Sequence, residues 1–271
     1  MKIQYQNNQI TVFESALYRT TSTVIGTKDS VIIVDPNWLP AEVESIATYV
    51  DVHYQNHRQY LLFTHSDYDH IIGYGKWPDA QVIASEKMDK NPSKDTIIHQ
   101  IRDFDNEYYI SRNYPVSYPF VDFAIYEDGQ VLEIGGLKLI FFHAAGHVKD
   151  GIFIIIPQLK CWIAGDYLSN IEIPFVDDDL IEYLHTLRKA RAVLSDFPDI
   201  ALLIPGHGDH TCERTEMQQR IENDTEYIQL LHRNPSSLNG TDIEAHIRKY
   251  SDNPNMIKAH DANVKKWLVK T

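Results

Sequence analysis

Side chains that commonly bind metal ions lie close together early in the sequence. They are His65, Asp67, Asp69 and His70, and they directly follow an apolar run at residues 60–64. Such a run is typical of a buried strand, and side chains beyond the carboxyl end of a strand project into one crevice. A polar loop with one helix-capping aspartate would account for Asp67 or Asp69 alone, but poorly for the whole set. The spacing therefore predicts a metal site after this strand.

Later segments place a histidine or an aspartate beside glycine, again just after a predicted strand. These segments are Gly146-His147, Gly165-Asp166 and Gly206-His207-Gly208. Glycine lets the backbone come close to a bound ion. Each segment alone is weak evidence, because a Gly-Asp pair is an ordinary turn. The ordered set, together with residues 65–70, is a strong indication of a metal centre.

Predicted strands and helices follow one another in an order that can position these side chains. Strands are predicted at 2–6, 9–14, 21–26, 31–35, 60–64, 81–84, 121–126, 130–134, 137–142, 152–156, 161–165 and 200–204. Helices are predicted from Pro40 to 50, near 94–106, at about 178–195 and in three stretches after 211. Both halves contain a group of strands and then a strand that ends in histidine. This pattern predicts two stacked β layers with helices outside, in a single domain 1–271 with a core of about 1–210 and a helical tail of about 211–271.

The composition excludes several classes of protein. Lys and Arg number 25 and Asp and Glu 38, which gives a net charge of −13 over 271 residues. An acidic chain is a poor match for nucleic acid or for an anionic membrane surface. No run approaches the roughly 20 apolar residues of a membrane span, and two cysteines are too few for a disulfide framework. We therefore expect a cytoplasmic protein with a small-molecule substrate.

With these motifs in view, the sequence resembles the metallo-β-lactamase superfamily over about residues 20–210. The first motif of that family is His-x-His-x-Asp-His, and here it is His65-x-Asp67-x-Asp69-His70. The later family residues match His147, Asp166 and His207. The resemblance implies an α+β fold, the four-layer αβ/βα sandwich, and leaves the helical tail outside the family's motifs. It also implies a homodimer as one expected assembly.

The resemblance further implies a ligand set for two divalent metal ions. One ion would be held by His65, Asp67 and His147, the other by Asp69, His70 and His207, and Asp166 would bridge both. A water or hydroxide would complete the pair, and such ions lie about 3.5–4 Å apart and lower the pKa of bound water. Asp69 and Asp166 are the expected catalytic residues, with Asp69 orienting the nucleophile or passing its proton to the leaving group.

Asp67 departs from the family motif, which has histidine at this position. The substitution makes the centre one charge unit more negative and a weaker Lewis acid. Zinc remains the first expectation, and harder oxygen ligation makes iron or manganese the alternatives. The main hypothesis is a hydrolase acting on an ester, lactone, thioester, amide or phosphoester. The alternative is an iron-dependent oxidoreductase on the same fold, and a non-enzymatic binding protein fits the full ligand set less well.

Four further residues are candidates for supporting the ions or the substrate. Asp35, at the end of an early strand, matches a family aspartate and is expected to support the centre. His143 lies four residues before His147 and could support the centre or be structural. Tyr68 and Tyr167 flank motif residues, and each could donate to a developing oxyanion or simply pack. Trp38 and the aromatic stretch 104–120 could cover a substrate pocket or pack in the same way.

Overall fold

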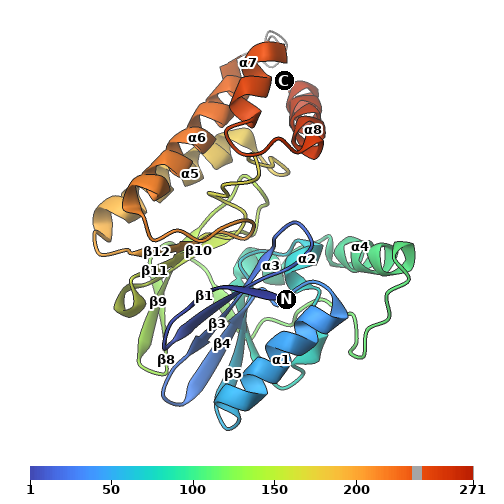
Figure 1. The fold of residues 1–271 in the computed structure, drawn as a ribbon, viewed down its shortest axis with the longest axis vertical. Helices are drawn as coiled ribbons and strands as arrows, with labels where there is room; N and C mark the ends of the chain where they lie inside the picture. Colours follow the sequence, from blue (N-terminus) through green and yellow to red (C-terminus); the bar gives the residue numbers. More distant parts are fainter. Residues whose placement is uncertain (234–239, 271) are drawn as a thin grey trace.

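Two β-sheets face each other in the computed structural model, which describes residues 1–233 and 240–270, with the side chains of 240–242 and 268–270 left aside (Figure 1). The first sheet has the order β1 (Lys2–Gln6), β2 (Ile10–Glu14), β3 (Thr21–Gly26), β4 (Ser30–Val34), β5 (Arg58–Leu62), β6 (Gln81–Ser85) and β7 (Phe123–Ile125). Its strands are antiparallel from β1 to β4 and parallel from β4 to β7.

The second sheet has the order β12 (Leu202–Ile204), β11 (Cys161–Ile163), β10 (Ile152–Ile156), β9 (Leu137–His143) and β8 (Gln130–Ile134). Strands β8 to β11 are antiparallel, and β11 and β12 are parallel. Both sheets are therefore mixed. In each sheet, the strands that come last in the sequence pair in parallel.

Each sheet buries both of its faces, which explains the continuous apolar runs in the strands. In β4, Ile32 and Val34 pack between the two sheets, whereas Val31 and Ile33 pack against the outer helices. In β10, the residues Ile152, Ile154 and Ile156 face the other sheet, and Phe153 and Ile155 face the outer helices. This alternation places one apolar core between the sheets and one outside each sheet.

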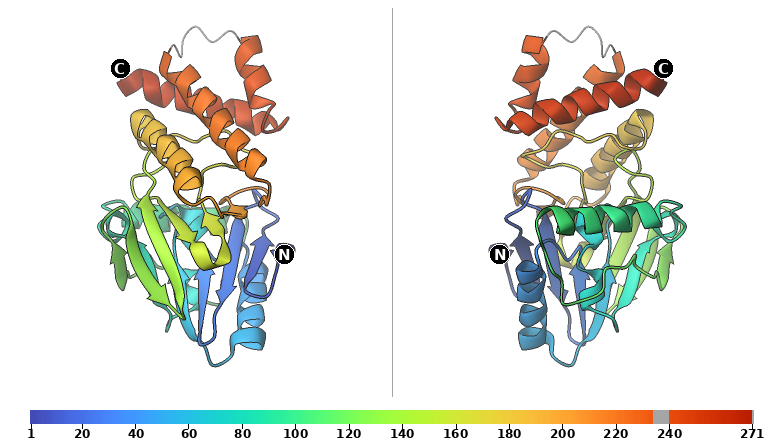
Figure 2. Two further views of the ribbon diagram at one scale, coloured as in Figure 1. Left: turned by 90° about the vertical axis from the view of Figure 1, so that its left-hand side faces the viewer. Right: turned by 90° about the vertical axis from the view of Figure 1, so that its right-hand side faces the viewer.

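Helices form the two outer layers (Figures 1 and 2). On the first sheet lie α1 (Pro40–Tyr54), the short helices α2 (Tyr68–Ile71) and α3 (Glu86–Asp89), and α4 (Lys94–Glu107). On the second sheet lie α5 (Leu180–Asp196) and α6 (Arg214–Arg233), followed by α7 (Gly240–Ile247) and α8 (Pro254–Lys270). Helix α1 begins at a proline, and α5 is capped by Asp179, which accepts from the N–H groups of Ile181 and Glu182. The predicted four-layer α+β sandwich with a helical C-terminal region is confirmed.

The observed elements agree closely with the sequence prediction and differ mainly at their ends. Strand β5 begins and ends two residues before the predicted 60–64, and β7 is shorter than the predicted 121–126. The helix expected near 94–106 is α4. The tail shares its apolar core with α5 and the second sheet, through residues such as Met217, Ile221 and Ile228. None of the helices in the described part of the chain has the length and apolar character that crossing a membrane requires.

Candidate metal centre

The strand ends bring the seven predicted ligands to one edge of the sandwich. Residues 65–70 follow β5, and His147, Asp166 and His207 follow β9, β11 and β12. The side chains lie in two neighbouring groups, in each of which the potential ligand atoms are within 4.8 Å of one another. One group is His65, Asp67, His147 and Asp166, and the other is Asp69, His70 and His207. These two groups agree with the partition that the family resemblance implies, and His65 and His70 also lie within the same distance of one another together with Asp35.

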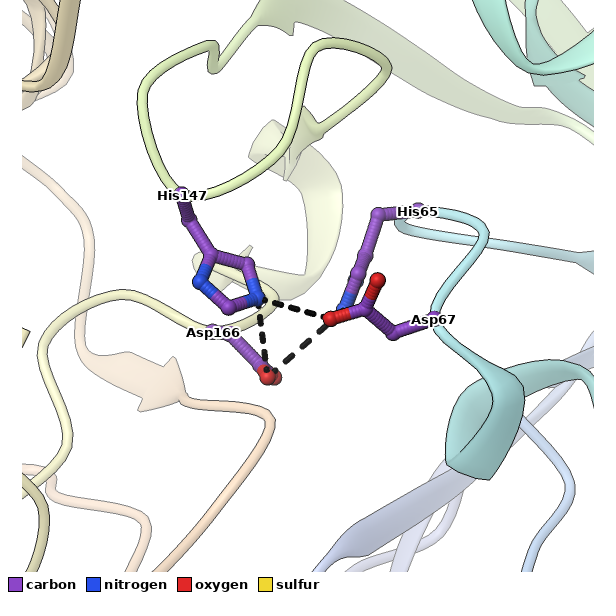
Figure 3. A group of neighbouring side chains, drawn as sticks. All are labelled: His65, Asp67, His147 and Asp166. Carbon is purple, nitrogen blue, oxygen red and sulfur yellow. Dashed lines mark hydrogen bonds and ion pairs between the residues drawn. The ribbon is translucent and has the colours of Figure 1, made fainter. Parts of the chain in front are cut away.

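The four side chains of the first group point toward one another from the loops that follow β5, β9 and β11 (Figure 3). The Nε2 atom of His147 lies 3.1 Å from Asp67 Oδ2 and 3.4 Å from Asp166 Oδ2. The Nε2 atom of His65 lies 3.7 Å and 3.6 Å from the same two carboxylates. This His65 nitrogen is buried and has no hydrogen-bond partner among the described residues. A buried nitrogen without a partner is costly, and a metal ion bound to this nitrogen would satisfy it.

The second group is arranged in the same way around Asp69. Its Oδ2 atom lies 3.5 Å from His70 Nε2 and 3.4 Å from His207 Nε2. Asp166 also reaches this group, because its Oδ1 lies 3.0 Å from His70 Nε2 and its Oδ2 lies 3.3 Å from His207 Nε2. Asp166 is therefore placed between the two groups, where a bridging ligand must lie.

The far nitrogen of every candidate histidine is already engaged. Each Nδ1 faces an oxygen: Thr64 Oγ1 for His65 (2.9 Å), Asp35 Oδ2 for His70 (3.0 Å), the Phe175 carbonyl for His147 (2.9 Å) and the Tyr18 carbonyl for His207 (3.0 Å). An Nδ1–H that donates to oxygen leaves the Nε2 lone pair of a neutral imidazole directed at the centre. Four such imidazoles with three carboxylates are a donor set that suits two divalent ions.

Asp35 supports two of these histidines. It accepts hydrogen bonds from His70 Nδ1, from the backbone N–H of Thr64 (2.9 Å) and from the Thr64 hydroxyl (2.6 Å). Because the Thr64 hydroxyl in turn faces His65 Nδ1, one buried carboxylate fixes a histidine in each group. This geometry is what we expected of a residue that supports the centre.

Electrostatics in the cluster favour charged side chains. Burial lowers the pKa of His70, but the charges of Asp166 and Asp69 raise it well above its usual value. Burial also lowers the pKa of His147 and of His207, but hydrogen bonds with Asp166 and Asp67 raise the first well above its usual value, and the charges of Glu172 and Asp166 raise the second. Burial raises the pKa of Asp67, but the hydrogen bond from His147 and the nearby histidine charges bring it down to about 2. The negative charge of the carboxylates thus favours positive charge at the centre. Without metal ions, this charge is carried by protonated imidazoles. With metal ions bound, the imidazoles are neutral.

The glycines beside Asp166 and His207 allow close packing of their loops. The backbone N–H of Gly206 donates to the carbonyl of Gly165 at 2.6 Å. A Cβ atom at Gly206 would lie 2.1 Å from Asp166 Oδ1. A side chain at residue 206 would therefore force the carboxylate of Asp166 to move.

Tyr167 holds the His147 loop. Its hydroxyl accepts from the backbone N–H of His147 at 3.0 Å and lies 2.7 Å from the carbonyl of Ala145, to which it donates. The side chain is buried. Since its one proton is directed at a backbone carbonyl, this arrangement favours the packing alternative for Tyr167 over the donor to an oxyanion.

Other candidates also take structural positions. The ring of Tyr68 packs against Trp38 and Phe104, and burial raises the pKa of its hydroxyl strongly. Trp38 itself is buried and donates from Nε1 to Thr20 Oγ1 at 2.6 Å, which favours the packing alternative for this residue. His143 belongs to neither ligand group, and its main chain bonds Asp128 and Lys189.

Sequence analysis missed two acidic residues near the centre. The side chain of Glu172 is 13% exposed, and its Oε2 lies 3.8 Å from His207 Nδ1. Asp150 accepts from the Ser66 hydroxyl at 2.5 Å and from Asn91 at 3.0 Å, which fixes the backbone beside Asp67. Neither belongs to a spaced motif. A search for further carboxylates shortly after Asp166 and His147 could have singled them out.

A cavity of about 470 Å³ opens beside the first ligand group. Ser66 and Asp67 form part of its wall, and the exposed lysines Lys87, Lys90 and Lys149 lie around it. Its volume is in the range of small-molecule sites. Asp67 is thus the ligand candidate that this cavity reaches.

Comparison with known proteins agrees with this picture. The family model described as the metallo-beta-lactamase superfamily matches residues 17–207. No curated protein sequence matches the chain. Among solved structures, a metallo-β-lactamase from Pontibacter korlensis is 15% identical with a TM-score of 0.60, and 84% of this chain and 98% of that chain are covered. A metallo-β-lactamase family protein from Thermus thermophilus is 16% identical with a TM-score of 0.61, covering 83% and 81%.

A third structural relative extends the similarity into the tail. It is a stereoselective inverting sec-alkylsulfatase from Pseudomonas sp., 12% identical with a TM-score of 0.74. The match covers 97% of this chain, so it includes most of the helical region after 211, and 50% of the sulfatase chain. The match of the family model over most of the chain, on a four-layer fold with two groups of ligand side chains, shows that the protein belongs to the metallo-β-lactamase superfamily of metal-dependent hydrolases.

Proposed function

We propose that the protein is a hydrolase that uses two divalent metal ions to cleave a small-molecule ester, lactone, thioester, amide or phosphoester. The main support for this proposal is that the two groups of candidate ligands share Asp166. The Nε2 atoms of the four histidines face the carboxylates of the same centre. His65, Asp67 and His147 would hold one ion and Asp69, His70 and His207 the other. Zinc is our first choice of metal. Bound ions would supply Lewis acidity that activates water and polarises the scissile bond.

The side chains of the protein have distinct parts in this proposal. Asp69 lies against His207 and His70, and we assign it to orient the attacking water and to pass its proton to the leaving group. Asp166 fixes the two groups relative to each other, because it contacts histidines of both. Asp35, Thr64 and Tyr167 fix the imidazoles and their loops, so that little reorganisation is needed during the reaction.

The cavity beside Asp67 is the proposed substrate site. Its volume of about 470 Å³ suits a small molecule, and its lining combines a mainly apolar surface with the charged side chains of Asp67, Lys87 and Lys149. Sulfate esters belong in the substrate search as well, because a structural relative is an alkylsulfatase. Two cysteines, neither in a disulfide, agree with a reducing compartment, and we propose a cytoplasmic location.

Asp67 favours one second candidate, an iron-dependent oxidoreductase. Its carboxylate stands where the family motif has histidine, within 3.1 Å of His147 Nε2. Oxygen donors shift the preference of a site from zinc toward iron or manganese. Metal analysis of protein purified without added metal separates the two candidates, because predominant iron with visible absorbance supports the oxidoreductase.

The test of the hydrolase proposal is a substrate screen with the metal-loaded protein. Lactones, thioesters, phosphodiesters and sulfate esters are assayed with the wild type, with chelator-treated protein and with Asp166→Ala. We expect hydrolysis of at least one class, lost on chelation and restored by metal. His185→Ala is the matched control, because His185 is 51% exposed on α5 and belongs to neither ligand group. Hydrolysis that survives both chelation and Asp166→Ala would refute the proposal.

A further inference from the structure

Helix α6 of the C-terminal region holds the backbone that follows Asp166. Leu168, two residues after Asp166, has a φ of 62°, a left-handed conformation that is unfavourable for leucine. Its N–H donates to Asp224 Oδ2 at 3.2 Å, and its carbonyl accepts from Arg220 Nη1 at 3.1 Å. Both Arg220 and Asp224 belong to α6 and are buried. One helix therefore fixes both polar groups of this residue.

The same guanidinium also reaches the loop of His207. Arg220 Nη1 donates to the carbonyl of Asp209, two residues after His207, at 2.8 Å. A single nitrogen thus joins the loops that carry two of the predicted ligands. These loops are also linked directly at their bases, where Gly206 donates to Gly165. Each loop is consequently held at two points, of which one comes from the tail.

The two clamping side chains are themselves fixed. The Nε of Arg220 donates to Glu216 Oε1 at 3.0 Å, one turn earlier on α6. The hydroxyl of Tyr250, which follows α7, donates to Asp224 Oδ1 at 2.9 Å. A bond between a fixed donor and a buried carbonyl positions that carbonyl, since the alternative is an unsatisfied buried group.

From this arrangement we infer that Arg220 and Asp224 are positioning residues of the metal centre. They act through Leu168 and Asp209 on the placement of Asp166 and His207, and so on the ion held by Asp69, His70 and His207. The inference rests on the proposed two-ion centre. It assigns to the tail, which lies beyond the 17–207 family match, a part in metal binding and not only in packing.

The experiment compares metal binding by the wild type, Arg220→Met, Arg220→Lys and Lys249→Met. Zinc affinity is measured by competition with a chelator, and the geometry of the site is followed by the visible spectrum of the cobalt-substituted protein. Arg220→Met removes the donor to both carbonyls and should weaken zinc binding by about 10–100-fold, most strongly for the ion held by Asp69, His70 and His207, with a changed cobalt spectrum. Arg220→Lys retains a donor and should recover most of the affinity.

Lys249→Met is the control for a general effect on the tail. It removes one positive charge and one ion pair, to Glu226 at 2.8 Å between α6 and the segment after α7, far from Leu168 in the hydrogen-bond network. We expect its zinc affinity and cobalt spectrum to match the wild type. Equal weakening by Lys249→Met and Arg220→Met would overturn the inference, as would unchanged binding by Arg220→Met.

Tyr250→Phe gives a second test if Arg220→Met does not fold. It removes only the hydroxyl that fixes Asp224, and should weaken zinc binding by a few fold and alter the cobalt spectrum. An unchanged affinity and spectrum in this variant also overturns the inference. The proposed function fails separately, if the wild type itself does not bind two ions.

Discussion

The two groups of candidate ligands have the same donors but different surroundings. Because residue 67 is aspartate, each group has two histidines and one aspartate of its own, and both share Asp166. In the second group His70 is fully buried and Asp69 nearly so, whereas the side chain of Asp67 in the first group is 32% exposed beside the cavity. Any difference in metal affinity or exchange between the sites must therefore come from what surrounds the donors.

The surroundings differ in how the histidines are held. His70 donates to the charged carboxylate of Asp35, and the loop of His207 is held by Arg220. His147 has a backbone carbonyl as its partner, and its loop depends on the hydroxyl of Tyr167. Charged partners make stronger hydrogen bonds than neutral ones. His207 and His147 both face backbone carbonyls through Nδ1, so the clearest difference is the direct bond of His70 to a charged carboxylate that His65 reaches only through Thr64.

Asp166→Ala removes what the two groups share and should have the largest effect. Without the shared carboxylate, both groups lose a donor and the charge that offsets their ions. We expect metal content to fall from two ions to less than one, and hydrolysis to fall by more than about a hundredfold. Elemental analysis and the substrate assay measure both. Retention of two ions would show that Asp166 does not bridge the groups.

Asp35→Asn should separate the two groups. The amide keeps the size of the side chain and tolerates the positive φ of 45° at this position, but it replaces a charged acceptor of His70. We expect about 10–100-fold weaker binding of one ion, with the other affected less because His65 is reached only through Thr64. Chelator competition resolves the two steps. Equal weakening of both steps would contradict the assignment of Asp35 mainly to the second group.

Asp67→His should make the donor atoms of the two groups different, because the first group would then have three histidines and the second only two. The imidazole makes the first group more positive and softer, so the variant should retain a larger share of zinc over iron or manganese than the wild type. The more positive centre should also move the acidic limb of the rate profile to lower pH, by about one unit. Metal analysis after growth in mixed metals and a pH–rate profile provide the check. An unchanged metal ratio would mean that residue 67 does not set the preference.

The metal-free protein should lose stability as the pH rises. We expect this effect to be smaller than those of the three substitutions above. The folded-state pKa values of His70, His147 and His207 are raised by the carboxylates. Their contribution is fully present below the unfolded pKa of about 6.5, and it is lost as the pH rises through the raised values. We expect the Tm of metal-free protein to fall by several degrees between about pH 6.5 and 9, and that of the metal-loaded protein to fall less. A Tm of the metal-free form that stays constant or increases would contradict this.

The sequence predicted local features of the site better than distant ones. Ligand positions follow from residues that come directly after apolar strands, and for this reason the seven candidates were found and are brought together. Their binding of ions stays a prediction. The part played by Tyr167 depends on a loop 20 residues earlier, and those of Arg220 and Asp224 depend on backbone groups more than 50 residues away. No local pattern encodes such contacts, because they arise only when the tail packs on the second sheet.

Gly206 gives access to the shared carboxylate without a change in any predicted ligand. A Cβ atom at this position would lie 2.1 Å from Asp166 Oδ1 and 3.0 Å from the carbonyl carbon of Gly165. A contact as short as the first requires the carboxylate of Asp166 to move. A side chain at residue 206 would therefore act on the position of Asp166 while its charge and all seven candidate donors stay in the chain.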